Sequence, residues 1–198
     1  SRFLTRTNKE VGRIQTLGPE AANHNIRKEV FREAVVIQMT WPGAPTIYYG
    51  DEAGLCGFTD PDNRRAFPWG MEDMELISLH RELIRIHKSN PELISGSIKE
   101  LYSEYNVIAY GRFLKEEQSV IILNNNDMEQ TIKLPVWLLQ IPKECMLEQL
   151  FVTSKEGHST QWRTYQVQEG MLTITLAPTS SVILKHKKIN RKKFLHFV

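Results

Sequence analysis

The 198-residue sequence has few cysteines and no long apolar run, and each shortage excludes a class of protein. Its two cysteines, Cys56 and Cys145, lie far apart and are too few for a disulfide framework or a zinc site. No apolar run approaches the ~20 residues that a membrane-spanning helix needs. We therefore expect a cytoplasmic protein with reduced thiols and no membrane partner.

The sequence also lacks a marked excess of either charge. The net charge is +2, with 25 basic and 23 acidic residues, so the charge balance indicates no particular class of partner. Basic residues cluster only in the tail 187–198. This tail could be a nucleic-acid arm, but we interpret it as a solvated chain end. We expect no nucleic-acid partner and no cofactor.

Helices are predicted in the first part of the chain. Residues 26–40 carry apolar side chains at helical spacing and end before Trp41-Pro42, because proline disfavours helix at the preceding residue. A second helix is predicted over 72–88, ending at Ser89-Asn90-Pro91. Its two histidines, His80 and His87, are isolated in the pattern, so we expect both to be exposed.

After Pro91 the pattern changes to short alternating runs separated by turn residues, which is typical of an antiparallel β-sandwich. The eight predicted strands are Ser97–Tyr102, Asn106–Leu114, Ser119–Asn124, Gln130–Leu134, Cys145–Phe151, Thr164–Gln168, Met171–Leu176 and Ser180–Lys185.

Between the two predicted helices lies the most distinctive stretch, residues 41–69. Pro42, Gly43 and Pro45 stop the first helix, and the apolar run Thr46–Tyr49 predicts a buried strand. The long loop from Gly50 to Trp69 is rich in Asp, Arg, Gly and aromatic residues. A loop of this length in a compact domain is usually functional or disordered. Its aromatic residues favour an ordered, functional loop.

This stretch closely resembles a signature of the α-amylase family, glycoside hydrolase family 13. Four motifs agree in order and without a gap: Pro42-Gly43-x-Pro45, Tyr48-Tyr49-Gly50-Asp51-Glu52, Asp60-Pro61-x-x-Arg64 and Pro68-Trp69. The resemblance is strongest to the neopullulanase, cyclomaltodextrinase and maltogenic amylase branch. It implies that residues 1–92 are the last strand and helices of a (β/α)8 TIM barrel, that 93–186 form a β-sandwich domain, and that 187–198 are a basic tail.

The resemblance also implies an activity for the intact protein: retaining hydrolysis of α-glucosidic bonds in maltodextrins, cyclodextrins or related α-glucosides. The family's three catalytic carboxylates precede this signature, so we expect this chain to hold no catalytic residue and to be inactive alone. Asp51 and Glu52 are poor substitutes, because adjacent side chains on a strand end point to opposite sides. Two alternatives stay open: a glucanotransferase of the same family, and a non-catalytic structural or carbohydrate-contacting sandwich module. The open barrel surface predicts a homo-oligomer.

Asp60 and Arg64 are the predicted substrate-binding residues. A carboxylate accepts hydrogen bonds from sugar hydroxyls and a guanidinium donates in a planar fork. The alternative, that the two pair to brace the loop, is equally consistent with their spacing. For Tyr49, Phe67 and Trp69 we favour packing within the core or loop over stacking on sugar rings. We expect no metal site: the Asp60-Pro61-Asp62 run is not an EF-hand, because arginines occupy its fifth and sixth positions. A different calcium site stays open.

Overall fold

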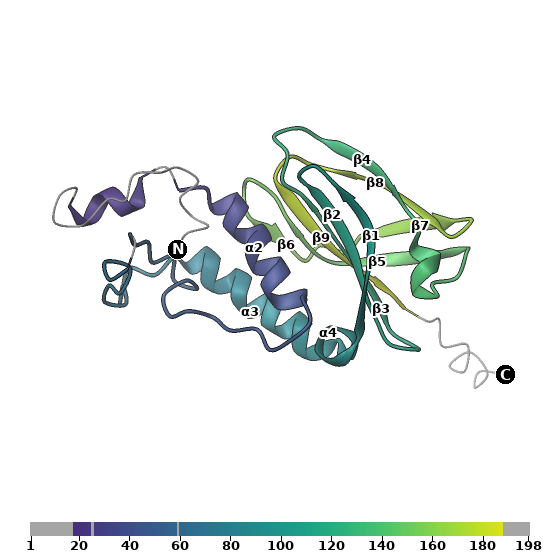
Figure 1. Cartoon of the computed structure of the whole chain (residues 1–198), viewed down its shortest axis with the longest axis horizontal. Coiled ribbons are helices and arrows are strands. Elements are labelled where there is room, and N and C mark those ends of the chain that lie inside the picture. Colours follow the sequence, from purple (N-terminus) through teal and green to yellow (C-terminus); the bar gives the residue numbers. More distant parts are fainter. Residues whose placement is uncertain (1–17, 25, 59, 188–198) are drawn as a thin grey trace.

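A computed structural model describes residues 18–24, 26–58 and 60–187, and it shows a helical layer against one curled, antiparallel sheet (Figure 1). The helical elements are the 3-10 helix η1 (Pro19–Asn23) and the α-helices α2 (Lys28–Thr40), α3 (Met74–Ser89) and α4 (Pro91–Ser95). A second 3-10 helix, η2 (Val136–Leu139), lies among the strands. None of the described helices is long and apolar enough to cross a membrane.

Nine strands make up the sheet. Their bounds are β1 (Ser97–Glu104), β2 (Val107–Phe113), β3 (Gln118–Asn124), β4 (Gln130–Leu134), β5 (Cys145–Thr153), β6 (His158–Ser159), β7 (Thr164–Gln168), β8 (Met171–Leu176) and β9 (Ser180–His186). All eight predicted strands are present within two residues of their expected ends. The two-residue strand β6 was not predicted, because two residues give no alternation to detect.

The strands form one continuous sheet in the order β1-β2-β3-β9-β5-β7-β8-β4, with β6 paired to β5. The sheet curls so far that its two ends share one hydrophobic core: Leu101 and Ala109 from β1 and β2 lie in the same cluster as Ile132 and Ile174 from β4 and β8. Register shifts at Glu100/Tyr102 and Gln149/Phe151 help it to bend. A single curled sheet of hydrogen-bonded strands therefore encloses the core.

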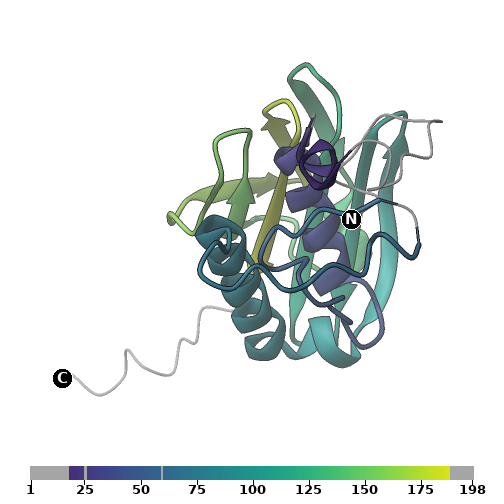
Figure 2. The ribbon, with the colours of Figure 1, turned by 90° about the vertical axis from the view of Figure 1, so that its left-hand side faces the viewer.

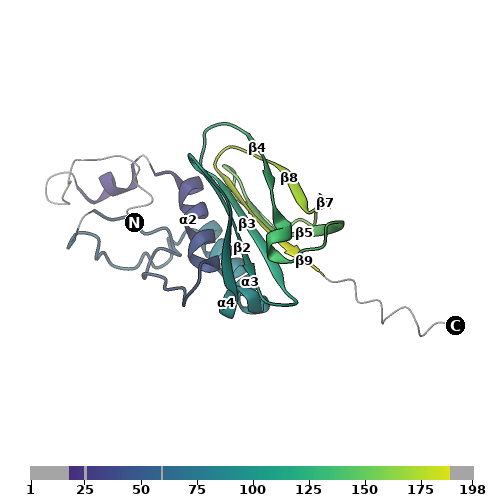
Figure 3. The same ribbon diagram turned by 45° about the vertical axis from the view of Figure 1, so that its right-hand side comes forward.

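A second core lies between the helices and the outside of this sheet. Helices α2 and α3 lie side by side against the sheet, with α2 over β9 and β5 (Figures 2 and 3). The cluster joins Val36 and Met39 of α2 and Leu79 and Leu83 of α3 to the strands. Its buried side chains from the sheet are Tyr110, Ile121, Leu123, Phe151 and Ile183.

Buried polar groups fix the helical layer to the sheet. Arg112 on β2 donates to the carbonyl of Thr40 at 2.5 Å and to that of Gly96 at 2.9 Å. Glu92 on α4 accepts hydrogen bonds from Lys185 of β9 at 2.6 Å and from Ser119 of β3 at 2.5 Å. Because these groups are buried away from water, each hydrogen bond offsets the cost of burying its polar donor and acceptor.

Two helix predictions need correction. The first helix begins at Lys28 rather than residue 26, and Arg27 is its N-cap residue. The second begins at Met74, because Asp73 accepts hydrogen bonds from the backbone N–H groups of Glu75 and Leu76. His80 is buried, not exposed: it lies one turn after Leu76, and its Nδ1 donates a hydrogen bond at 2.7 Å to the carbonyl of that residue. The basic tail, apart from residue 187, lies outside the described residues.

Candidate functional site

The segment between α2 and α3, residues 41–73, contains neither helix nor strand in its described part. Its start is fixed by Trp41, whose ring meets the Tyr110 ring edge-on at 5.3 Å. Its end is fixed where the Asp73 N–H donates to the Ala53 carbonyl at 3.0 Å. The prediction of a strand at Thr46–Tyr49 is therefore wrong for this chain. A strand needs a neighbour for its backbone groups, and no described strand lies beside this segment.

A tight double turn follows at Tyr48–Leu55. The Asp51 N–H donates to the Tyr48 carbonyl at 3.1 Å, and the Leu55 N–H donates to the Gly50 carbonyl at 2.8 Å. Gly50 has a φ of +88°, and an added Cβ would lie 2.7 Å from the Leu55 side chain. Only glycine fits this position without strain. The turn leaves Tyr48 and Tyr49 exposed beside it.

Asp60 and Arg64 form an exposed ion pair. The Arg64 Nε lies 2.8 Å from the Asp60 Oδ1, and the two side chains are 66% and 60% exposed. The Arg64 N–H also donates to the Pro61 carbonyl at 3.0 Å, so a backbone turn lies within the five residues that the ion pair spans. The structure thus brings the two predicted binding residues together. The pair braces the loop, while most of both charged groups faces solvent and can reach a ligand.

The neighbouring arginine, Arg65, has a different role, which the sequence analysis missed. Its Nη1 donates to the Cys56 carbonyl at 2.9 Å, and its own carbonyl accepts from the Tyr49 hydroxyl at 2.9 Å. Cys56 is buried, and this burial raises the pKa of its thiol. Arg65 therefore ties the loop together on its inner side, which leaves Arg64 as the outward-facing guanidinium.

Aromatic side chains line the exposed part of the loop. Tyr48 and Tyr49 have ring centroids 4.9 Å apart, and Phe67 and Trp69 have centroids 4.5 Å apart. Trp69 is 80% exposed and Tyr49 is 44% exposed, so neither side chain lies in a core, and each packs on another ring of this segment. Flat aromatic faces next to a carboxylate and a guanidinium are the groups with which a protein can bind a hydroxylated ring.

Acidic groups in the loop do not assemble into a metal centre. Within residues 18–24, 26–58 and 60–187, no three His, Cys, Asp or Glu side chains are grouped closely enough to hold a metal ion. Two buried oxygens of the loop, Glu52 Oε2 and Asn63 Oδ1, have no hydrogen-bond partner among the described residues. The described part of the loop offers hydrogen-bonding groups and aromatic ring faces.

Comparison with known proteins gives this loop a context. The chain is 35% identical over 159 residues to neopullulanase 2 of Thermoactinomyces vulgaris. The aligned region covers 78% of this chain and 25% of that protein. It is 30% identical over 186 residues to a cyclomaltodextrinase of Thermoanaerobacter pseudethanolicus. That aligned region covers 93% of this chain and 26% of the relative. A search for matching family profiles found none.

A solved structure supports the same relationship. The debranching enzyme of Nostoc punctiforme superimposes with a TM-score of 0.63 at 29% sequence identity, over 80% of this chain and 31% of that chain. The chain belongs to the α-amylase family of glycoside hydrolases, family 13. Within that family it is similar to the neopullulanase and cyclomaltodextrinase branch. It spans about a quarter of the length of the two curated relatives, at 25% and 26%.

Proposed function

We propose that this chain is the C-terminal part of a retaining α-glucan hydrolase, and that residues 50–69 form one wall of its glucan site. The observation that carries the proposal is the outward-facing Asp60–Arg64 pair on a loop that also exposes Tyr49 and Trp69. Similarity to a neopullulanase and a cyclomaltodextrinase supports maltodextrins or cyclodextrins as the substrates. The catalytic carboxylates would come from other parts of the intact protein.

In this proposal, residues 1–92 complete a (β/α)8 barrel and 93–186 form the domain that follows it. Barrel enzymes build their active sites from the loops after the strands. Support comes from the order of the elements: helix α2, the long segment 41–73 and then helix α3.

Arg64 provides the test in the intact enzyme. Hydrogen bonds to charged groups contribute ~1.5–3 kcal/mol each, so Arg64→Ala should lower kcat/KM by about one to two orders of magnitude on long maltooligosaccharides. The loss should shrink on short substrates that leave the neighbouring subsite empty. Arg85→Ala is the matched control. Like Arg64, Arg85 is largely exposed, at 62%, and it is paired with a carboxylate, Glu82 of α3.

A loss that is equal for every chain length, and that follows a lower melting temperature, would show that Arg64 only braces the loop. The isolated 198-residue chain should not turn over maltodextrin, cyclodextrin or a chromogenic maltoside. Turnover abolished by a substitution within this chain would contradict the proposed lack of catalytic residues. Product analysis with added glucose as acceptor distinguishes hydrolysis from glucanotransfer, which is the second candidate.

Binding to the isolated chain separates the loop from the sheet domain. Trp69→Ala should remove any retention on immobilised glucan, whereas Trp162→Ala, which changes a tryptophan with 69% exposure in the β6–β7 connection, should not. The reverse pattern would favour a carbohydrate-contacting role for the sheet domain.

A further inference from the structure

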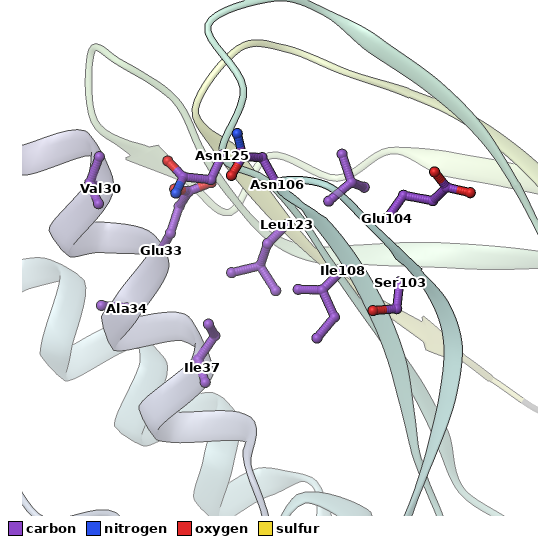
Figure 4. A pocket seen from close by; sticks show the side chains of 11 residues that line it. Val30, Glu33, Ala34, Ile37, Ser103, Glu104, Asn106, Ile108, Leu123 and Asn125 are labelled. Carbon is purple, nitrogen blue, oxygen red and sulfur yellow. The ribbon is translucent and has the colours of Figure 1, made fainter.

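A cavity of about 340 Å³ lies between helix α2 and the strands β1, β2 and β3 (Figure 4). Its floor is aliphatic: Val30, Ala34 and Ile37 come from the helix, and Ile108 and Leu123 come from the sheet. Within the part of the chain that the structure describes, no aromatic and no basic side chain lines it. Such a volume is within the lower range of small-molecule sites.

One carboxyl group lies at the end of this aliphatic floor. Glu33 is only 4% exposed, and its Oε1 has no hydrogen-bond partner among the described residues. Figure 4 shows its side chain extending from α2 toward Asn125 and Asn106, at the upper end of the cavity. A buried polar atom without a partner is costly, and such atoms are rare in folded proteins. The cavity therefore presents an unmet hydrogen-bonding demand beside an apolar surface.

The charges around Glu33 do not meet this demand. On its own helix, Glu29 pairs with the N-cap residue Arg27 at 2.6 Å, and Arg27 also reaches Asp127 at 3.5 Å. From the sheet, Glu104 of β1 lines the cavity as a second carboxylate. Burial raises the pKa of Glu33 to about 8, with Arg27 opposing the shift and Glu29 adding to it. A cation placed inside the cavity would find no competing positive charge in its lining.

We propose that this cavity binds an aliphatic ammonium group, with the alkyl stem on the Val30–Ile37 face and the ammonium nitrogen on the Glu33 carboxylate. The alkyl stem matches the aliphatic floor of the cavity, and the positive charge matches the end that holds the Glu33 carboxyl group. A sugar would fit it poorly, because the aliphatic floor would leave its hydroxyls without partners. A free alkylamine and a lysine side chain of another polypeptide share this chemistry.

Binding should be coupled to the loss of a proton. In the free cavity at neutral pH the Glu33 carboxyl is protonated, since its pKa is about 8. An ammonium ion 3 Å away favours the ionised form, so the carboxyl releases its proton to solvent as the amine enters. Apparent affinity should therefore rise with pH below about pH 8, by up to roughly tenfold per unit, and level off above it while the amine stays protonated.

The test uses the full chain and n-hexylammonium chloride, with 1-hexanol and sodium hexanoate as neutral and anionic probes of the same length. Isothermal titration in two buffers of different ionisation enthalpy should show amine binding with release of about one proton at pH 7. Hexanol should bind more weakly and without proton release. A lysine-containing peptide and its acetyl-lysine counterpart distinguish a polypeptide source from a free amine.

Glu33→Gln should weaken hexylammonium binding by about tenfold or more and leave hexanol binding unchanged. Glu104→Gln removes a charge at the exposed edge of the same cavity. It should change the affinity for hexylammonium less than about threefold, as expected for an exposed charge. Ala34→Phe should fill the cavity and abolish binding of both probes. Equal binding of amine and alcohol, an unchanged amine affinity in Glu33→Gln, or no binding of hexylammonium would each overturn the proposal.

Discussion

At the scale of single residues, Glu33 is a side chain whose negative charge the fold disfavours. Its pKa rises from 4.5 to about 8 because burial disfavours the carboxylate. Ionisation therefore penalises the folded state from about pH 4.5 upward, and the penalty grows until about pH 8. Above that pH both folded and unfolded forms are ionised, so the penalty is constant.

Glu33→Gln removes this penalty while keeping the shape of the side chain. We expect its free energy of unfolding to exceed that of the wild type by an amount that grows with pH, by up to ~1.4 kcal/mol per unit between about pH 5 and pH 8. Urea unfolding across this range measures the difference. Glu82→Gln is the control: Arg85 holds the pKa of Glu82 below its ordinary value, so this change should bring no gain. A pH-independent difference for Glu33→Gln would contradict the expectation.

How far single residues could be predicted depended on which face of an element they occupy. The prediction that His80 is exposed was wrong, although its spacing from Leu76 and Leu83 places it on the buried face of α3. The position of His80 in the helical pattern predicts its burial, whereas its residue type alone does not. The exposure of Trp69 could not be predicted, because an aromatic residue in a loop carries no periodic signal. Asp60 and Arg64 were predicted from a motif, and the motif did not show whether they pair.

Helix α3 has a well-defined start that can be tested. Asp73 Oδ1 accepts from the N–H of Glu75 at 3.1 Å and from that of Leu76 at 3.3 Å, and Lys28 of α2 forms an ion pair with its other oxygen. Burial opposes ionisation, but these hydrogen bonds together hold the pKa of Asp73 below its ordinary value.

Asp73→Ala should lower the free energy of unfolding by about 1–2 kcal/mol, because two N–H groups of the first turn lose their acceptor. Asp73→Asn should recover most of this loss, since an amide oxygen can still accept both hydrogen bonds. Chemical denaturation of the three proteins provides the comparison. An alanine variant as stable as the wild type, or an asparagine variant as weak as alanine, would show that the cap contributes little.

The elements themselves were largely predictable from the pattern of apolar residues. Strands β4, β7 and β8 begin and end where the alternation does, because one face of each lies in the enclosed core and the other faces solvent. Thr46–Tyr49 has the composition of a strand but not its partner, and composition alone cannot supply one. The joining of all strands into one sheet was not predictable, since pairing between distant strands leaves no local signal.

The whole molecule is held together by groups on both sides of the predicted boundary near residue 92. Lys185 is 7% exposed in its side chain and is paired with the fully buried Glu92, while Glu117 lies 2.5 Å away on the other side. A domain that began after residue 92 would keep Lys185 but lose Glu92. It would also uncover the sheet face around Tyr110, Phe151 and Ile183.

A chain that begins at Leu93 should therefore be less stable than one that begins at Met74 and keeps α3 and α4. Removing one partner of a buried ion pair costs about 3–5 kcal/mol, and the remaining Glu117 places the expected loss near the lower limit. Thermal unfolding and binding of an apolar dye compare the two chains. Equal melting temperatures and no dye binding would show that the sheet domain is independent of the helices.

Exposed apolar side chains around residues 41–74 should make the chain associate with itself. Trp69 is 80% exposed and Met71 is 81% exposed, and Trp41, Tyr48 and Met74 add to the same segment. Exposed apolar patches of this kind mark interaction sites. Light scattering should show a mean mass that increases with concentration, and Trp69→Lys with Met71→Lys should reduce it. Trp162→Lys is the control. A monomer at every concentration would contradict this expectation.

The curled sheet ends in two strands, β1 and β4, that each have one neighbour in the described chain, and this has a consequence for a newly made polypeptide. Unpaired strand edges can recruit other chains into fibrils. Here β1 carries Lys99, Glu100 and Glu104 and a bulge, while β4 has only five residues, includes Lys133 and is followed by Pro135. Charge, brevity and irregularity at these two edges therefore oppose the edge-to-edge pairing from which fibrils grow.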